Sequence, residues 1–397
     1  MPKLRHVAVA ALCAALLILT GCGRAESGHP GPSRTTGANG LHDGPAWRYD
    51  YTGKDTNASF EDIAAASADD AWAVGKSPVT GWVDDQRTLL FHYDGKAWRP
   101  YDLPPALRRL DELPIVRLDA SGPGDVWLFA GVLTNPERSH PPLAAHWDGK
   151  TWQVVDLPRD FPDAVFGAAA FGPEDAWVVS RTDTAWHWDG RQWRDFRLPG
   201  RAYALAGVSG RDLWAVGAGP ESESVPGAAA MHWDGKKWTE ATLPTEPPGP
   251  EDDPHFAELN YVVALSTRDV RAFGDVLSEG GDSDAYSAAL ELRWDGSRWA
   301  KQDEPACCVT GHGPKAFFLS PKRYLTPSGE ELRITQPPCL AGRPGKVGAK
   351  GCRQKLQLED YAAVPGTRQT WGVGSVRGSG AGADPARPVI VRLTAAP

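Results

Sequence analysis

A tryptophan-rich motif recurs along this chain and constrains its fold more than any other feature. The first half of the motif reads Asp-x-Trp-Ala-Val-Gly, and the second half reads His-Trp-Asp-Gly-x-x-Trp. The second half occurs five times and closes at Trp98, Trp152, Trp193, Trp238 and Trp299. Consecutive closing tryptophans are 41 to 61 residues apart, a period typical of repeat architectures. We therefore interpret the chain first as an array of structural repeats.

Each repeat is predicted to form four strands, a to d. Asp-Gly between two apolar runs predicts a tight hairpin between strands c and d, because both residues tolerate a positive φ. The Asp before the first-half Trp ends a second tight turn, between strands a and b. The a strands are rich in Ala, Val and Gly, which suits strands crowded around an axis; they are residues 63–66, 115–118, 164–170, 203–208, 261–265 and 361–364. A small sheet with two apolar faces must stack against its copies, so we predict an all-β fold, a β-propeller.

The predicted number of blades is seven, and six is the alternative. Residues 305–357 lack the Trp motif, but residues 323–334 resemble a c–d hairpin with Ser-Gly in place of Asp-Gly. We interpret this segment as a degenerate blade; if it is only an insertion, the ring has six blades. The last blade ends with a c strand at residues 389–393. We expect residues 47–51 to supply its missing outer strand and to close the ring, which also removes an open sheet edge.

The N-terminus has the features of an export signal. Lys3 and Arg5 precede an apolar run at residues 7–19, which is too short for a resident transmembrane helix. The following Leu-Thr-Gly-Cys22 resembles the lipobox of bacterial lipoproteins, in which the cysteine is lipidated and becomes the mature N-terminus. The resemblance implies a signal peptide at residues 1–21, lipidation of Cys22, and an exported protein anchored at the outer face of the cell membrane. An ordinary signal peptide with a chance cysteine is the alternative.

Residues 22–41 are rich in Gly, Ser, Pro and Thr and are predicted to be a flexible tether, followed by the propeller at residues 42–397. The formal net charge is −8, and loss of Lys3 and Arg5 with the signal brings it to −10. This acidic balance argues against nucleic acid as a partner. We expect a monomer.

Four cysteines remain in the mature propeller, and all lie in the degenerate blade: Cys307, Cys308, Cys339 and Cys352. A bond between neighbours 307 and 308 is strained, so each is expected to pair with one of the other two, and both such pairings stay open. Unpaired thiols are the alternative, although an oxidising compartment favours disulfides. No CxxC spacing supports a zinc site.

Long b–c and inter-blade loops are predicted to share one face of the ring, where rigid scaffolds place binding sites. These loops cover residues 76–88, 131–142, 218–227, 245–257 and 275–286. Several are acidic, and their candidate ligand residues are Glu251, Asp252, Asp253, Asp282 and Asp284. One interpretation is solubility; the other is a rim that binds a basic partner or Ca²⁺. The spacing does not match an EF-hand loop, no other cofactor is predicted, and the sequence does not identify a metal.

No catalytic residue is assigned. His92, His146, His187 and His232 recur beside aspartates, but a catalytic group is needed once, so we interpret them as structural hydrogen-bonding residues within each blade. No GxSxG, HExxH, P-loop or GxGxxG motif occurs in its required context. A single acid–base pair on the central axis stays open.

The motif Asp-x-Trp-Ala-Val-Gly…His-Trp-Asp-Gly-x-x-Trp resembles the repeats of tectonin-type propellers, and more loosely kelch and Asp-box repeats. The resemblance implies a propeller with lectin-like binding of glycans or cell-surface material. The b–c loops are longer here, so no binding residues are carried over. Two functions follow: a lipid-anchored binding or scaffold protein for a cell-envelope glycan or protein, or an extracellular glycosidase or lyase with carboxylates near the axis.

Overall fold

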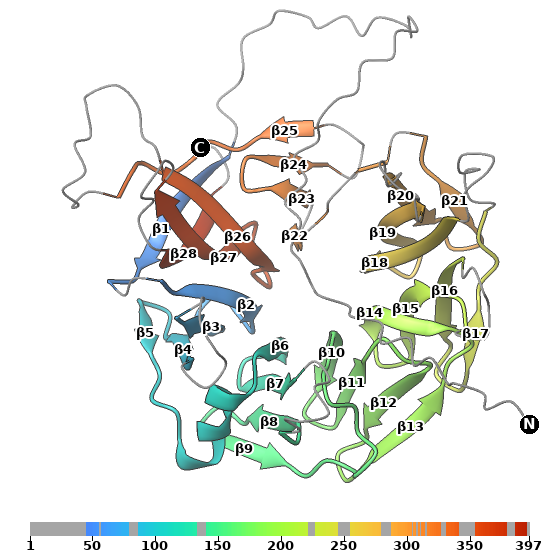
Figure 1. The fold of residues 1–397 in the computed structure, drawn as a ribbon, viewed down its shortest axis with the longest axis horizontal. Helices are drawn as coiled ribbons and strands as arrows, with labels where there is room; N and C mark the ends of the chain where they lie inside the picture. Colours follow the sequence, from blue (N-terminus) through green and yellow to red (C-terminus); the bar gives the residue numbers. More distant parts are fainter. Residues whose placement is uncertain are drawn as a thin grey trace, which may run out of the picture. The chain divides into compact units, whose positions relative to one another are not determined.

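Seven four-stranded antiparallel sheets stand around a central axis as the blades of a propeller (Figure 1). This is a computed structural model, which describes residues 45–54, 57–78, 86–132, 140–220, 227–244, 255–278, 287–303, 305–306, 309, 311–313, 316–326, 331–340, 354–378 and 386–394. Residues 43–397 form one unit. The seven-bladed prediction is confirmed, and the six-bladed alternative is wrong because the segment after residue 305 forms its own sheet.

The first four blades follow the chain in order, each from its inner strand to its outer strand. Blade 1 contains β2 (Ser59–Ala65), β3 (Ala71–Ser77), β4 (Arg87–Tyr93) and β5 (Trp98–Pro100). Blade 2 contains β6 (Ile115–Gly122), β7 (Asp125–Gly131), β8 (Leu143–Trp147) and β9 (Trp152–Val155). Blade 3 contains β10 (Gly167–Gly172), β11 (Asp175–Val179), β12 (Thr184–Trp188) and β13 (Trp193–Arg197). Blade 4 contains β14 (Arg201–Ser209), β15 (Asp212–Ala218), β16 (Ala228–Trp233) and β17 (Trp238–Glu240).

The remaining blades include the degenerate one and the one that joins both ends of the propeller. Blade 5 contains β18 (His255–Ser266), β19 (Asp269–Ser278), β20 (Ser287–Trp294) and β21 (Trp299–Lys301). Blade 6 contains β22 (Gly311–Gly313), β23 (Ala316–Ser320), β24 (Arg323–Leu325) and β25 (Glu331–Arg333). Blade 7 contains β26 (Gln354–Ala363), β27 (Thr370–Gly378), β28 (Arg387–Thr394) and, as its outer strand, β1 (Ala46–Thr52).

Strand β1 closes the ring as the sequence predicts. It pairs antiparallel with β28, and Trp47 lies opposite Leu393. It is also held by blade 6, because the Trp47 amide donates to the Thr335 carbonyl (3.0 Å) and Trp47 Nε1 donates to the Pro321 carbonyl (2.8 Å). The first described strand therefore links the last two blades.

The hydrophobic core lies between blades rather than within them. Each of seven buried clusters joins two neighbouring blades, and together they complete the circle. At five of the seven interfaces between blades, a tryptophan of one blade packs against a tryptophan of the next. The first-half Trp of one blade meets the closing Trp of the next nearly edge-on; the pairs are Trp72–Trp152, Trp127–Trp193, Trp177–Trp238, Trp214–Trp299 and Trp371–Trp98, with centroids 4.9 to 6.1 Å apart.

The two interfaces of blade 6 use other residues. Arg271 occupies the first-half Trp position of blade 5 and lies 5.2 Å from the centroid of the Phe317 ring in blade 6. Its buried charge is matched by Glu291 (3.2 Å), which also accepts a hydrogen bond from the Ala306 amide. Between blades 6 and 7, Phe318 packs against Trp47 (5.6 Å). A buried ion pair thus replaces a tryptophan where the motif degenerates.

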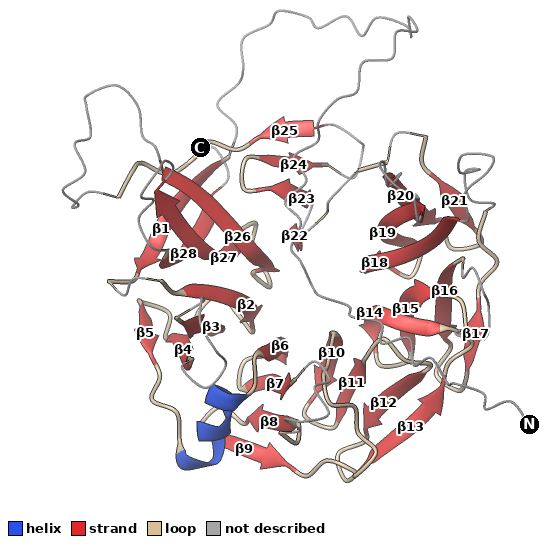
Figure 2. Cartoon of the chain, viewed as in Figure 1, coloured by secondary structure: helices blue, strands red, loops and turns tan. Residues whose placement is uncertain are grey.

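One helix, η2 (Pro105–Glu112), links blades 1 and 2 on the outside of the ring (Figure 2). Its Leu107 and Leu110 are fully buried in the cluster between these blades. No helix among the described residues has the length and apolar character needed to cross a membrane.

Candidate binding site on the propeller axis

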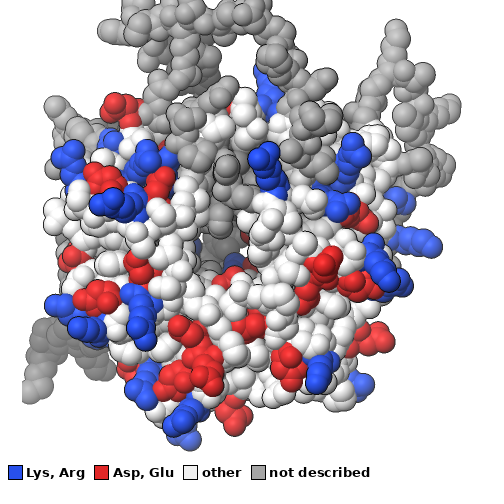
Figure 3. Space-filling view, turned by 180° about the vertical axis from the view of Figure 1, so that it is seen from behind, with Lys and Arg blue, Asp and Glu red and all other residues white. Residues whose placement is uncertain are grey.

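A cavity of about 490 Å³ lies on the axis, where the inner strands of six blades face one another. Blades 1 to 5 and blade 7 line it, and no described residue of blade 6 does. Figure 3 shows one face of the ring hollowed at its centre, with acidic side chains near the hollow. The volume falls within the range of small-ligand sites, roughly 300–1,000 Å³.

Four β-bulges build one layer of this cavity. In blades 1, 4, 5 and 7 the pairing of the inner strand with its neighbour skips one residue that lines the cavity. These residues are Glu61, Tyr203, Asn260 and Glu359. An extra residue in a strand re-aims its side chain, a use of bulges that is common beside functional sites.

Sequence reasoning missed these residues, although the motif carries a signal for them. The Gly three positions after the first-half Trp lies against each bulge. A Cβ on Gly75 would lie 2.1 Å from the Ser59 carbonyl oxygen, and Gly217, Gly274 and Gly374 are equally crowded. In blade 2 the equivalent residue is Ala130, and its pairing with Val116 is regular; the register shift of that blade lies further along, between Ala120 and Gly122. The glycine thus marks the blades that contribute a bulge residue.

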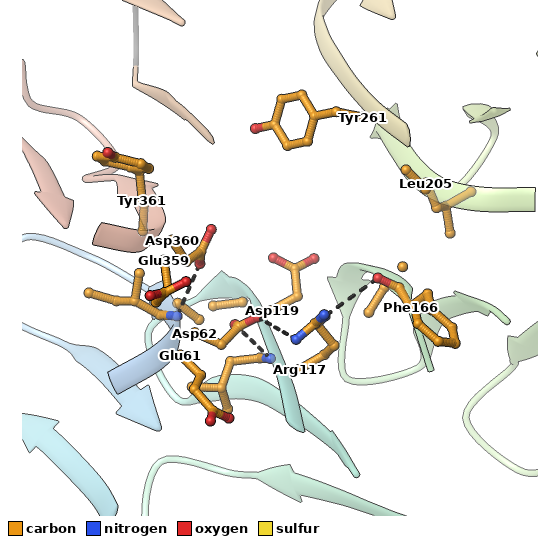
Figure 4. A pocket seen from close by; sticks show the side chains of 18 of the residues that line it. Glu61, Asp62, Arg117, Asp119, Phe166, Leu205, Tyr261, Glu359, Asp360 and Tyr361 are labelled. Carbon is orange, nitrogen blue, oxygen red and sulfur yellow. Dashed lines mark hydrogen bonds and ion pairs between the residues drawn. The ribbon is translucent and has the colours of Figure 1, made fainter. Parts of the chain in front are cut away.

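One side of the cavity is acidic. The charged lining residues are Glu61, Asp62, Asp119, Glu359, Asp360 and a single base, Arg117. Figure 4 shows the carboxyl groups of blades 7 and 1 gathered on one side, with Phe166 and Leu205 opposite and Tyr261 between. The cavity therefore has an acidic half from blades 7, 1 and 2 and an aromatic, uncharged half from blades 3, 4 and 5.

Three of the aspartates also clamp neighbouring blades together. Each accepts a hydrogen bond from a main-chain amide on the inner strand of the next blade. The bonds run from Ile63 to Asp360 (3.1 Å), from Leu118 to Asp62 (3.0 Å) and from Ala170 to Asp119 (2.6 Å). One oxygen of each carboxyl group is thus committed to the scaffold.

Burial sets the protonation of this cluster. It raises the pKa of Asp62 to about 7, against the opposing charge of Arg117, which lies 3.6 Å away. Burial also raises the pKa of Asp119 to about 7 and that of Asp360 well above its usual range, and in Asp360 the charge of Asp62 adds to the shift. The pKa values of Glu61 and Glu359 are raised by burial too. Asp62 and Asp119 therefore titrate near neutral pH.

The repeated histidines are structural. Each donates from Nε2 to the motif Asp of its own blade, in the pairs His92–Asp70 (2.9 Å), His146–Asp125 (2.6 Å), His187–Asp175 (2.9 Å) and His232–Asp212 (2.7 Å). Blade 5 keeps the pattern with arginine, because Arg293 makes two hydrogen bonds to Asp269. Each histidine therefore hydrogen-bonds within its own blade, as the sequence predicts.

Other predicted residues fall outside the described part of the chain. They are Cys22, Cys307, Cys308, Cys352 and the acidic rim residues Glu251, Asp252, Asp253, Asp282 and Asp284. Cys339 follows β25, and its pairing stays a prediction. The described residues contain no group of three or more His, Cys, Asp or Glu side chains placed to hold a metal.

Several predicted loop ends were wrong because they lie inside strands, and two of them carry a buried or partly buried charged residue. Asp275 lies inside β19 rather than in an acidic loop, and burial raises its pKa. Lys76 lies inside β3, where its side chain is buried and donates to the Leu110 carbonyl (2.6 Å). Both strands run further than the periodicity suggests, because their partner strands continue alongside them.

Comparison with known proteins gives the fold and little else. No protein-family model and no curated protein matches the chain in sequence. In structure the chain is similar to YCF48 bound to D1 peptide, with a TM-score of 0.52 and 13% identity over 90% of this chain and 99% of that chain. The WD40 propeller domain of Doa1 is also similar, with a TM-score of 0.43 and 9% identity over 88% of this chain and 97% of that chain. The likeness to YCF48 shows the propeller fold alone.

Proposed function

We propose that the chain is a lipid-anchored, extracytoplasmic binding protein that offers the axial cavity to a protein partner of the cell envelope. The observation that carries this proposal is the chemistry of the cavity, in which five carboxyl groups and one guanidinium face an aromatic side. Carboxylates attract a cation, and aromatic rings accept its alkyl stem. The cavity therefore suits a lysine or arginine side chain of the partner. YCF48, a propeller of the same fold, holds a peptide.

Binding is favoured over catalysis by what the carboxyl groups already do. Asp62, Asp119 and Asp360 each hold a main-chain amide of the next blade, so they are fixed parts of the wall. A wall of fixed carboxyl groups favours a cation that stays bound. Binding also shifts protonation: a cation stabilises the ionised form, so its entry releases protons near neutral pH.

A lysine peptide tests this function directly. We expect acetyl-Gly-Gly-Lys-Gly-Gly-amide to bind the purified mature protein, and the same peptide with norleucine at the lysine position to bind at least about 10-fold more weakly. The double change Glu61→Gln and Glu359→Gln should remove most of this preference. Glu240→Gln, an exposed change at the end of β17, is the matched control. Equal binding of both peptides would exclude a cation site.

The lipid anchor has its own test. Cys22→Ala should move the protein from the membrane fraction to the soluble fraction and remove incorporation of labelled palmitate. If the Cys22→Ala protein still fractionates with membranes, the lipobox interpretation is wrong, and the binding function is untouched by that result.

A hydrolytic function is the second candidate, and Glu61 and Glu359 favour it. They occupy equivalent bulges of adjacent blades, and burial, with a smaller contribution from the charge of Glu359, raises the pKa of Glu61. Glycosidases use two carboxyl groups in different protonation states. Turnover of envelope polysaccharide that is lost in Glu61→Gln would favour this candidate over simple binding.

A further inference from the structure

Arg181, in the short b–c loop of blade 3, has a left-handed backbone conformation. It has a φ of 54°, and the one other described non-glycine residue with positive φ is an asparagine, Asn57, a residue type that tolerates it. The short b–c loop of blade 3 holds Arg181 in place: its amide donates to the Ala202 carbonyl (2.8 Å), and the Ala202 amide donates to the Thr182 carbonyl (2.9 Å). Residues with a strained backbone cluster at ligand-binding and active sites, so this conformation suggests a functional role for the Arg181 side chain.

The Arg181 side chain lies against the wall of the axial cavity. Its guanidinium carbon is 4.9 Å from the ring centroids of both Phe166 and Tyr203, and both rings line the cavity. The guanidinium of Arg201 is 6.0 Å from the centroid of the same Tyr203 ring. Rings that stack on a guanidinium fix its plane and leave its N–H edge available for a ligand.

No described carboxylate uses that edge. Asp183, two residues further along, is paired with Arg197 (2.7 Å), and Arg201 Nε donates to the Gly219 carbonyl (3.3 Å). Phe166 lies across the cavity from Asp360 and Glu359 (Figure 4). Arg181, which packs on Phe166, therefore lies on the side of the cavity opposite these two carboxyl groups.

We propose that Arg181, supported by Arg201, is a carboxylate-binding subsite on the rim over blades 3 and 4. This inference rests on the proposed function, because the carboxylate is that of the peptide segment whose basic side chain enters the cavity. A planar guanidinium binds a carboxylate with two parallel hydrogen bonds, which gives orientation as well as affinity. The partner segment is thus recognised by one positive and one negative group in a fixed direction.

Peptides that differ only at their C-terminus test the subsite. Acetyl-lysyl peptides followed by zero to four glycines are prepared with either a free carboxylate or an amide, and binding to the mature protein is measured by calorimetry. For at least one spacing we expect the carboxylate form to bind about 10-fold more tightly. Arg181→Gln should abolish that advantage and leave affinity for the amide peptides unchanged.

Two further variants control for misfolding and for a general loss of positive charge. Arg181→Gly relieves the positive φ, so its folding is not at risk, and it should also abolish the advantage. Arg194→Gln removes another exposed arginine of blade 3, one that pairs with Asp189, and should leave the advantage intact. Equal binding of both peptide forms, or an equal loss in Arg194→Gln, would overturn the subsite.

The outcomes separate the two proposals. If amide peptides bind and the carboxylate adds nothing, the subsite is wrong and the proposed function stands. If no lysine peptide binds in either form, both are wrong. If glucuronic acid binds with dependence on Arg181 while no lysine peptide binds, the carboxylate comes from a glycan, and the assignment to a peptide is overturned.

Discussion

Each first-half tryptophan stabilises two blades at once. Trp214 packs against His232 of its own blade (4.5 Å) and against Trp299 of the next (4.9 Å), and it is almost fully buried. The histidine in turn is held by Asp212. The motif is therefore a chain of contacts from a turn, through a ring stack, to the neighbouring blade, which explains why Asp, Trp and His recur together.

Truncating one of these rings should loosen an interface. Trp214→Ala leaves a cavity between blades 4 and 5, and we expect it to lower the free energy of unfolding by about 3–5 kcal/mol. Val154→Ala, at a residue 45% exposed, should change it by less than about 0.5 kcal/mol. Denaturant unfolding measures both changes. Similarly small losses of unfolding free energy in the two variants would show that the tryptophans do not hold neighbouring blades together.

The axial aspartates should make stability depend on pH in an unusual direction. Asp119 has a pKa of about 7 in the folded chain, above its ordinary value of 3.8, so the folded state holds a proton that the unfolded state has lost. Its contribution is fully present below pH 3.8 and is lost as pH rises towards 7. Asp119→Asn keeps an acceptor for the Ala170 amide, so we expect its Tm to exceed that of the parent by about 1–3 °C more at pH 8 than at pH 5.

Asp148 provides the opposite case within the next hairpin of the same blade. The amides of Thr151 and Lys150 lower its pKa, so its contribution is present above the unfolded pKa and is lost as pH falls. Asp148→Asn should therefore lower Tm at pH 8 and have little effect at pH 3. If both variants shift in the same direction with pH, burial does not govern the Asp119 carboxyl group.

At the scale of strands, the four inner bulges connect the repeat to the binding site. Gly75→Ala places a Cβ on the backbone of β2 and must shift the bulge that carries Glu61. We expect a loss of about 1–3 kcal/mol, the usual cost of overpacking, together with weaker binding of the lysine peptide. Gly122→Ala is the matched control, because a Cβ there has no neighbour within 4 Å. Thermal unfolding and calorimetry of both variants check this.

The strands were predictable because their signals are local and repeated. Asp-Gly turns and Trp spacing located all five regular blades, and the leftover hairpin at residues 323–334 revealed blade 6. The axial site was not predictable in the same way. Asp62, Asp119 and Asp360 lie at least 57 residues apart in the sequence, and only the closed ring brings them together. The bulges depend on backbone crowding, for which the motif glycine is an indirect sign.

At the scale of the whole molecule, we expect closure by β1 to make the seven blades unfold cooperatively, as one unit. Every blade buries its faces against two neighbours, and an open ring would expose two faces and an unpaired sheet edge. Blade 6 has three-residue outer strands and lacks the tryptophan motif, so it depends most on β1, which meets it through Trp47. The weakest blade therefore lies beside the closing strand.

Disrupting the pairing of β1 with β28 should lower the free energy of unfolding more than disrupting the outer strand of another blade. In Tyr49→Pro the ring loses a donor and gains a fixed φ in the middle of β1, opposite Val391. We expect a loss of at least about 3 kcal/mol and self-association driven by the freed edge of β28. Arg99→Pro, in the outer strand β5 of blade 1, is the control, because it alters an outer strand that closes no ring. Light scattering and unfolding of the two proteins measure the difference. An equal response would mean that the ring holds its shape by blade packing alone, and that β1 contributes no more than the outer strand of any other blade.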